Sequence, residues 1–453
     1  MTSPAHSIYA EELFKLGHGY PLWFPDCRRE TNGVMIGDIG YIDQGSFHRL
    51  FNATLDKSNP INALGVPEDF QVFAELGDVA TVCTPDALPR GPLYSRTIMP
   101  IDFHSDTLTG RFSCSGGNGA LLIVGSPATR EQLTHIRRIK NYMFKNQAHW
   151  LDFAQDRGRE VCAEGIIFVR GWVKTTRWAV AALTEGGENV ELSFHGFEAD
   201  APFSATNYSS FYHHTGPRQE TPQVDTVAAD QCIFVHYCKL KRRRFIPNSW
   251  KLQAAAEPQD PPPSSDDETN GTQESQCTSS GWSDPVDYIL EYIFQYTLAE
   301  AAIASDTDLS DLCKVGNLEQ PQARHVTVTH ANILQLANCP LPEDIPDFLR
   351  RMRPQIELTQ EGVGMLSLDD SITDLKNNGV AGTTEKRDDG CLSSLCMIPS
   401  NKNLHLTVDP WTPHLSIAMS SLVSQSICIR SVPQDHVASL PPTLDSCGAV
   451  SQD

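Results

Sequence analysis

Cysteine, serine and histidine are the side chains of this sequence that could act as nucleophile and base. Cys114 and Ser115 stand at the start of SGGNG (115–119), and His104 or His135 could serve as the base that activates either one. No G-x-S-x-G pattern, which marks a nucleophile on a strained strand-to-helix turn, surrounds them. We therefore favour a buried structural role for Cys114 and assign no catalytic residue.

The glycines of SGGNG also invite comparison with phosphate-binding loops. Such loops follow a strand and precede a helix, so that backbone N–H groups and the helix N-terminus meet the phosphate. Here the glycines come before the apolar segment ALLIVG (120–125), and no Gly-Lys-Ser or Gly-Lys-Thr is present. The pattern favours a hairpin turn over a nucleotide site.

Cys232, His236 and Cys238 alternate along one predicted strand, so their side chains should share a face. Cys232 and His236 would nevertheless lie about 13 Å apart, which is too far for one zinc ion with bonds of about 2.0–2.3 Å. His213 and His214 could contribute from elsewhere, but the chain contains no C-x-x-C. We expect neither a metal ion nor a cofactor.

Basic residues are densest in the run KLKRRR, which resembles a nuclear-import signal. The run directly continues the predicted strand CIFVHYC, and basic residues at the end of an edge strand discourage edge-to-edge pairing. We prefer the edge-strand interpretation, although an acidic partner or the protein's own acidic linker could occupy the charges. This candidate interaction patch consists of Lys239, Lys241, Arg242, Arg243 and Arg244.

Five aromatic residues could line a ligand pocket: Tyr20, Trp23, Phe24, Trp172 and Trp178. In a core built on sheets, however, tryptophan and tyrosine more often pack against their neighbours. We expect packing to be their role.

These residues must be positioned by the element pattern of residues 8–250, which predicts an α+β core domain. Strands are expected at 33–42 and 46–55 as a hairpin, and again in IIFVRGWVK, TRWAVAALT, VELSFHGFEA and CIFVHYC. One long helix at about 127–155, with Ser126-Pro127 as N-cap and first turn, should pack on a mostly antiparallel sheet. Four basic residues are placed on its solvent side: Arg130, Arg137, Lys140 and Lys145.

The C-terminal half is predicted to be organised differently. Residues 253–284 contain seven acidic and no basic side chains, and too little apolar surface to offset chain entropy, so they should form a disordered acidic linker. Asp284-Pro285 then begins an apolar helix, and HVTVTH (325–330) suggests a strand. The segment 285–355 should dock on the core, with a partner protein as the alternative surface. Residues 356–453 are expected to form a largely disordered tail.

Charge and composition limit the possible partners. The 453-residue chain has a net charge of −21, and its residues 1–252 carry 25 basic and 27 acidic side chains, so the excess lies in the C-terminal half. Nucleic-acid binding is disfavoured, because an acidic chain gains little from releasing phosphate counterions. No apolar run approaches the roughly 20 residues of a membrane span. Thirteen cysteines and no secretory signal indicate reduced thiols in a soluble intracellular protein, cytoplasmic with the nucleus as an alternative.

Several strings together resemble a protein family of mushroom-forming (agaricomycete) fungi. They are GHGYPLWFPDCRRETNGVMIGDIGYI, FSCSGGNGALLIVGSPATREQL and RRIKNYMFKNQAHWLDFAQDRGRE. The resemblance covers roughly 8–250 together with parts of 284–330. It implies an intracellular basidiomycete protein, and it transfers no catalytic residue because the family has no established activity.

We therefore expect a non-enzymatic intracellular interaction or recognition module that binds another protein through a sheet edge or through the helix at 285–303. Two alternatives stay open. One is an enzyme of unrecognised type, such as a hydrolase that uses Cys114 or Ser115. The other is a nuclear regulatory protein directed by KLKRRR.

Overall fold

The protein is described by a computed structural model, and the described residues are 3–25, 33–73, 81–134, 136–184, 190–206, 211–217, 229–243, 284–318 and 341–367. None of the helices in these ranges is both long and apolar enough to cross a membrane. The chain divides into two compact units, of which the first comprises 1–368 and 428–453. All elements described below belong to that unit.

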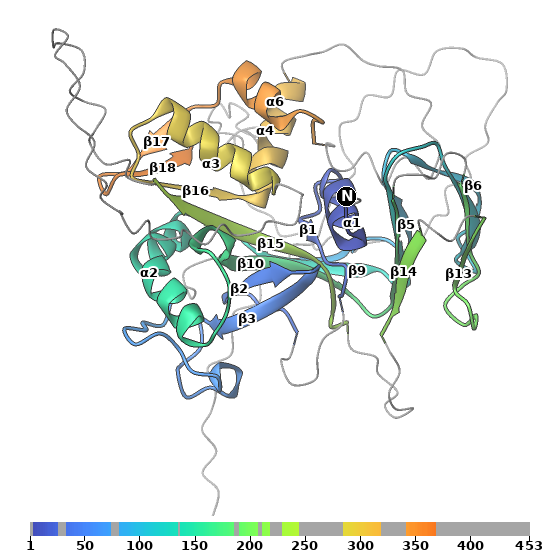
Figure 1. The fold of residues 1–453 in the computed structure, drawn as a ribbon, viewed down its shortest axis with the longest axis horizontal. Coiled ribbons are helices and arrows are strands. Elements are labelled where there is room, and N and C mark those ends of the chain that lie inside the picture. Colours follow the sequence, from blue (N-terminus) through green and yellow to red (C-terminus); the bar gives the residue numbers. More distant parts are fainter. Residues whose placement is uncertain are drawn as a thin grey trace, which may run out of the picture. The chain divides into compact units, whose positions relative to one another are not determined.

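A long twisted sheet forms the centre of this unit (Figure 1). Its strands run in the order β17 (Ile356–Leu358), β18 (Val363–Leu366), β16 (Ala301–Ser305), β15 (Gln231–Arg242), β10 (Ile167–Thr175), β2 (Asp38–Asp43) and β3 (Ser46–Asn52). Three further strands join it, β1 (Tyr20–Pro21) on β15, β9 (Ala128–Leu133) on β10, and β4 (Thr81–Leu88) on β9. Every pair is antiparallel except β16 with β18.

Helices cover both faces of this sheet. Because side chains alternate along β15, its residues show which helix covers which face. Val235 and Tyr237 contact the cluster that contains α3 (Pro285–Tyr296), whereas Cys238 and Leu240 contact the cluster that contains α2 (Ile136–Asp156). The two helices accordingly lie on opposite sides of β15 (Figure 1). The α3 side also contains α4 (Asp306–Leu318) and α6 (Ile345–Met352).

Two four-stranded sheets pack face to face. The inner sheet consists of β14 (Phe211–Gly216), β11 (Trp178–Leu183), β8 (Gly119–Val124) and β5 (Gly91–Tyr94). The chain connects this inner sheet to the long sheet from β8 to β9, from β10 to β11 and from β14 to β15. The outer sheet consists of β13 (Phe203–Ala205), β12 (Val190–Phe194), β7 (Thr109–Cys114) and β6 (Ile98–His104). Side chains such as Leu121 and Phe112 fill the space between them. The other face of the inner sheet packs against α1 (Ala5–Phe14).

The α+β class and the mostly antiparallel pairing are confirmed, and so is the first hairpin. β2 and β3 are joined by the two-residue turn Gln44-Gly45, in which both residues have positive φ, 47° and 80°. Such a turn matches the right-handed twist of a hairpin, and it needs a glycine or another residue that tolerates this conformation.

The long helix is present, but its predicted start is wrong. α2 begins at Ile136, and residues 128–133 form β9 instead. β9 hydrogen-bonds β4 on one edge and β10 on the other, so tertiary pairing overrides the helical propensity of this stretch. Ser126 does not cap a helix, since its hydroxyl lies 3.0 Å from that of Thr175.

The prediction of a tail from 356 is wrong for its first residues. β17 and β18 extend the long sheet, and β18 pairs in parallel with β16 at Ala301 and Ala302. The sheet thus needs chain up to Leu366 to complete this side. The rest of the tail, the linker apart from Asp284, and the predicted strand at 325–330 lie outside the described residues. Two short 3-10 turns complete the described elements, η2 (Pro60–Asn62) and η4 (Ala163–Gly165).

Candidate functional site

The basic run lies at the end of β15, and the edge-strand interpretation of it is wrong. β15 is hydrogen-bonded to β10 on one side and to β16 on the other, so it is a central strand. Its residues Lys239 and Lys241 therefore face the elements that cover the sheet. Arg244 lies outside the described residues.

Both lysines of the run pair with acidic residues at the start of α3. Lys239 Nζ lies 3.1 Å from Oδ2 of Asp284 and 2.7 Å from Oδ1 of Asp287, and its side chain is 9% exposed. Burial alone would lower the pKa of Lys239, but these two carboxylates raise it above its ordinary value. Lys241 Nζ lies 2.6 Å from Glu291, whose side chain is mostly exposed.

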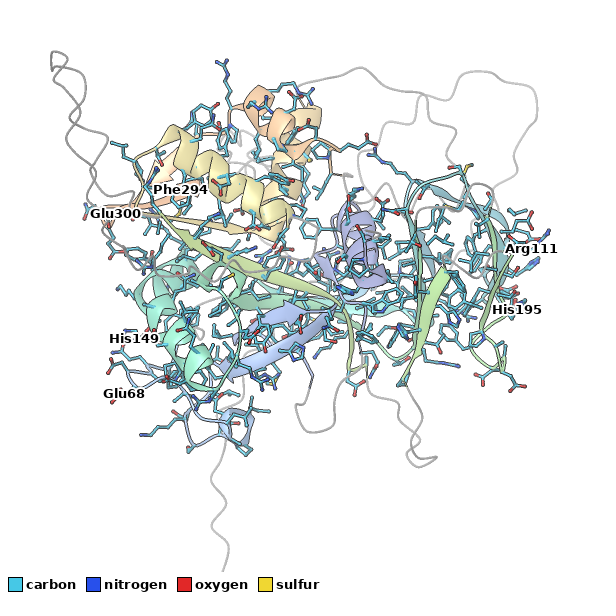
Figure 2. All side chains as sticks on the ribbon, viewed as in Figure 1. Glu68, Arg111, His149, His195, Phe294 and Glu300 are labelled. Carbon is cyan, nitrogen blue, oxygen red and sulfur yellow. The ribbon has the colours of Figure 1, made fainter. Side chains whose placement is uncertain are left out.

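The arginines of the run contact backbone and aromatic rings. Arg243 donates hydrogen bonds to the carbonyl oxygens of Phe294, Thr297 and Ala299, which include acceptors left unsatisfied at the C-terminus of α3. Its guanidinium also lies 4.9 Å from the ring of Phe294, which is labelled in Figure 2. Arg242 donates to the carbonyl of Phe144 in α2. The four described members of the patch thus bind the protein's own helices.

The predicted alignment of Cys232, His236 and Cys238 is wrong because of a β-bulge. Val173 pairs with Phe234, whereas Lys174 pairs with Cys232, so one extra residue is inserted in β15. A bulge shifts the alternation of side chains by one position. Cys232 consequently packs in the α3 cluster, while Cys238 packs in the α2 cluster.

His236 forms a buried pair with Asp306, the first residue of α4. The distance from Nδ1 to Oδ2 is 2.6 Å, and both side chains are at most 2% exposed. The other carboxylate oxygen accepts the N–H of Tyr237, so Asp306 replaces the ladder partner that β16 no longer supplies. Burial alone would raise the pKa of Asp306, but His236 and Arg170 lower it below its ordinary value.

Cys114 is far from His104, which excludes that nucleophile and base combination. Cys114 is buried and pairs with Ile98 at one end of β6, whereas His104 pairs with Thr109 at the other end. This length of strand corresponds to about 20 Å. His135, the other candidate base, lies outside the described residues.

The predicted hairpin turn at 115–119 is also wrong. The segment leads from β7 of the outer sheet to β8 of the inner sheet, and these strands do not pair with each other. The N–H of Ser115 donates to the carbonyl of Thr97 at 2.9 Å. β8 is followed by β9, so this segment lacks the strand–loop–helix order of a phosphate-binding loop.

Two of the aromatic residues are buried as predicted, and one is part of an exposed surface. Trp23 and Trp178 pack in the cluster between α1 and the inner sheet. Phe24 is 36% exposed, and its ring centroid lies 4.8 Å from that of His214 on β14. Tyr212, two residues earlier on the same strand, is 50% exposed. Tyr212, His214 and Phe24 form what we call the β14 surface.

The sequence pattern placed two basic residues wrongly, one on β9 and one on α2. The predicted position of Arg130 on the solvent side of a helix is wrong, because Arg130 lies on a strand between β4 and β10. The predicted exposure of Lys140 is wrong as well, because its side chain is buried and its Nζ lies 3.8 Å from Oδ2 of Asp308. The segment ATREQL does not alternate between apolar and polar residues, so the sequence itself carried no local signal for a strand here.

Neither the metal-ligating residue types nor comparisons with known proteins assign a family or a cofactor to this site. Among the described residues no group of three or more His, Cys, Asp or Glu side chains is arranged to hold a metal ion. No protein-family model, curated protein or solved structure matches the chain.

Proposed function

We propose that this protein is a non-enzymatic intracellular interaction module, which binds an extended segment of another protein along the free edge of β14. The observation that carries the proposal is the regularity of this edge. β14 pairs with β11 over six consecutive residues without a bulge, and within the described ranges its other edge has no partner strand. An unpaired row of N–H and C=O groups is a template for strand addition.

The contrast with β6 supports the choice of β14. β6 also exposes large apolar side chains, Met99 at 60% and Ile101 at 45%. However, Pro100 lacks an N–H group, and the register shifts between Pro100 and Asp102. Proline and bulges are features that protect edge strands from pairing. β14 has neither, and no lysine lies in its sequence FYHHTG.

The side chains of the β14 surface supply the apolar contacts that an added strand requires. Tyr212 and His214 project from the same face of β14, and His214 contacts both Trp23 and Phe24. Directly opposed side chains on neighbouring strands contribute about 0.2–1 kcal/mol each, with aromatic pairs among the favourable ones. A partner with apolar or aromatic residues at alternate positions would therefore bind best.

The competing expectations have less support. The apolar face of α3 is covered by the long sheet, with Val286, Ile289 and Ile293 fully buried, so this helix is not an open docking surface. The four described basic residues of the KLKRRR run are engaged with α2 and α3.

The test uses a displayed library of extended peptides and the full-length protein. We expect enriched peptides to slow amide hydrogen exchange in residues 211–216 and to bind Tyr212→Lys about tenfold more weakly, because a lysine on the edge opposes strand addition. Met99→Lys, on the guarded strand β6, is the matched control and should bind as the wild type does. Slow exchange of 211–216 already in the free protein would mean that the chain itself covers this edge. That result, or equal binding by Tyr212→Lys, would contradict the proposal.

A further inference from the structure

A cavity of about 220 Å³ lies next to β9, separate from the β14 surface. Its wall includes residues 86–93, where β4 departs from regular pairing between Thr84 and Leu88 and leads into β5. Arg130 and His18 also line the cavity. The volume corresponds to about seven water molecules at about 30 Å³ each, which suits a small organic molecule.

Arg130 is the charged group of this cavity whose Nε has no hydrogen-bond acceptor in the described part of the chain. It sits on β9 opposite Thr84 of β4 and Val173 of β10. Its Nε is buried, and the described residues offer it no hydrogen-bond acceptor. Burial lowers the pKa of Arg130 and Asp306 partly offsets this, but an arginine stays charged at neutral pH. An unpaired buried guanidinium N–H is costly, so an unfilled acceptor position is expected beside it.

Further unpaired polar atoms lie on the same part of the long sheet. Gln132 of β9 and His236 of β15 occupy one row across the sheet, both opposite Gly171 of β10. Oε1 of Gln132 and Nε2 of His236 are buried without a hydrogen-bond partner among the described residues, and so is Nε of Arg170. Buried polar atoms without a partner are rare in folded proteins, but none of these three residues lines the cavity, so they mark a polar surrounding of the site and do not extend it.

The electrostatic balance of the cavity favours an anion. Burial, followed by the nearby charges of Arg130 and His236, lowers the pKa of His18 to about 3, so His18 is neutral at pH 7. The cavity wall then carries two positive charges, Arg90 and Arg130, against the single carboxylate of Asp86. Asp306, the buried carboxylate that acts on Arg130, is already paired with His236 and Arg170.

We propose that this cavity binds a small oxyanion, a carboxylate or phosphate group, through the guanidinium of Arg130. The planar fork of an arginine, formed by Nε and one Nη, matches two oxygens of either group. Neutral His18 and the 86–93 segment would enclose the rest of the ligand. The site is independent of the β14 surface, so each proposal can fail without the other.

Isothermal titration of the full-length protein with inorganic phosphate and with succinate tests the inference. We expect one of these anions to bind at a single site, and Arg130→Gln to weaken that binding about tenfold, equivalent to about 1.4 kcal/mol. Arg130→Lys keeps the charge but loses the fork, so its affinity should fall between the two. The matched control is Arg111→Gln, which removes an exposed arginine of the outer sheet (Figure 2) and should leave binding unchanged.

A second readout guards against a variant that fails to fold. In a spectrum of ¹⁵N-labelled arginine side chains, the Nε–H signal that is lost in Arg130→Lys should shift when the wild type binds the anion. Binding of phosphate alone or of succinate alone would assign the ligand class. Absence of binding by both anions, unchanged affinity in Arg130→Gln, or equal weakening in Arg111→Gln would overturn the proposal.

Discussion

Nζ of Lys239 lies 3.1 Å from Oδ2 of Asp284, although 45 positions separate the two residues in the sequence. Asp284 also caps α3 by accepting the N–H of Val286, and it accepts the hydroxyl of Tyr237 at 2.7 Å. One carboxylate thus joins the start of α3 to two side chains of the central strand. The attachment of α3 to β15 is therefore ionic at its N-terminus and apolar along its length.

Replacement of Lys239 should destabilise this attachment. Lys239→Met leaves Asp284 and Asp287 close together without a cation, and breaking such a buried pair costs about 3 kcal/mol. Lys241→Met is the matched control, since its partner Glu291 is largely exposed and such pairs contribute less than about 1 kcal/mol. Urea unfolding measures the free energy of unfolding of each variant. An equal loss of unfolding free energy in the two variants would contradict a stabilising role of Lys239 between Asp284 and Asp287.

The pair of His236 and Asp306 should make stability depend on pH in acid. The pKa of Asp306 is lowered in the folded state, so its contribution is complete above the unfolded-state pKa of about 3.9 and is lost as the pH falls through the folded-state pKa. At about pH 7 we expect Asp306→Asn to be less stable than the wild type by about 2 kcal/mol. This difference should shrink at about pH 3 in urea unfolding, whereas the exposed control Asp311→Asn should show little difference at either pH. A constant difference would contradict the assignment.

Gly171 should not tolerate a side chain. A Cβ there would lie 2.6 Å from the carbonyl oxygen of Glu131 and 2.7 Å from Cβ of Gln132, so β9 and β10 would have to separate. We expect Gly171→Ala to lower the free energy of unfolding by about 2 kcal/mol. In Gly165→Ala the nearest atom would be Cγ2 of Val161 at 3.2 Å, which is the end of a side chain and can move. Thermal unfolding should therefore rank the second variant well above the first.

Thiol reactivity separates a structural Cys114 from a catalytic one. Cys114 is buried, and burial raises the pKa of Cys238 to about 12, so both thiols should react slowly with iodoacetamide at about pH 8. Cys83 and Cys162 are only half-buried and should be labelled before these two. Quantitative mass spectrometry of the labelled peptides measures the order. Rapid labelling of Cys114 ahead of Cys83 would revive the cysteine-hydrolase alternative.

Local patterns predicted those elements whose partners are close in the sequence. The β2–β3 hairpin was predictable because alternation on both sides of Gln44-Gly45 specifies a two-residue turn. The helix at 285 was predictable because Asp284 and Pro285 form a cap and first turn ahead of an apolar stripe. In both cases the decisive interactions lie within a few residues.

The errors occur where distant chain decides the structure. Residues 128–133 have helix-forming side chains, but pairing with β4 and β10 makes them a strand, and this moved Arg130 from an assumed solvent face to the cavity wall. The bulge in β15 is equally invisible in CIFVHYC, because it is defined by the register against β10. The acidic partners of Lys239 and Lys241 could not be matched to them from spacing alone. The candidate cavity is assembled from β4, β5, β9 and the loop after α1, so single-segment patterns could not reveal it.

The central position of β15 also bears on how the chain could be divided. Its neighbours β1 and β10 come from the chain before Arg243, whereas β16, α3 and β18 come from the chain after Asp284. A cut between these two residues would leave one fragment with an uncovered strand and the other with the strand and helix that complete it. We expect fragments 1–243 and 284–453, when produced together, to reassociate without a covalent link. The two fragments could then be used as a complementation reporter, in which reassembly shows that the two proteins fused to them are close together.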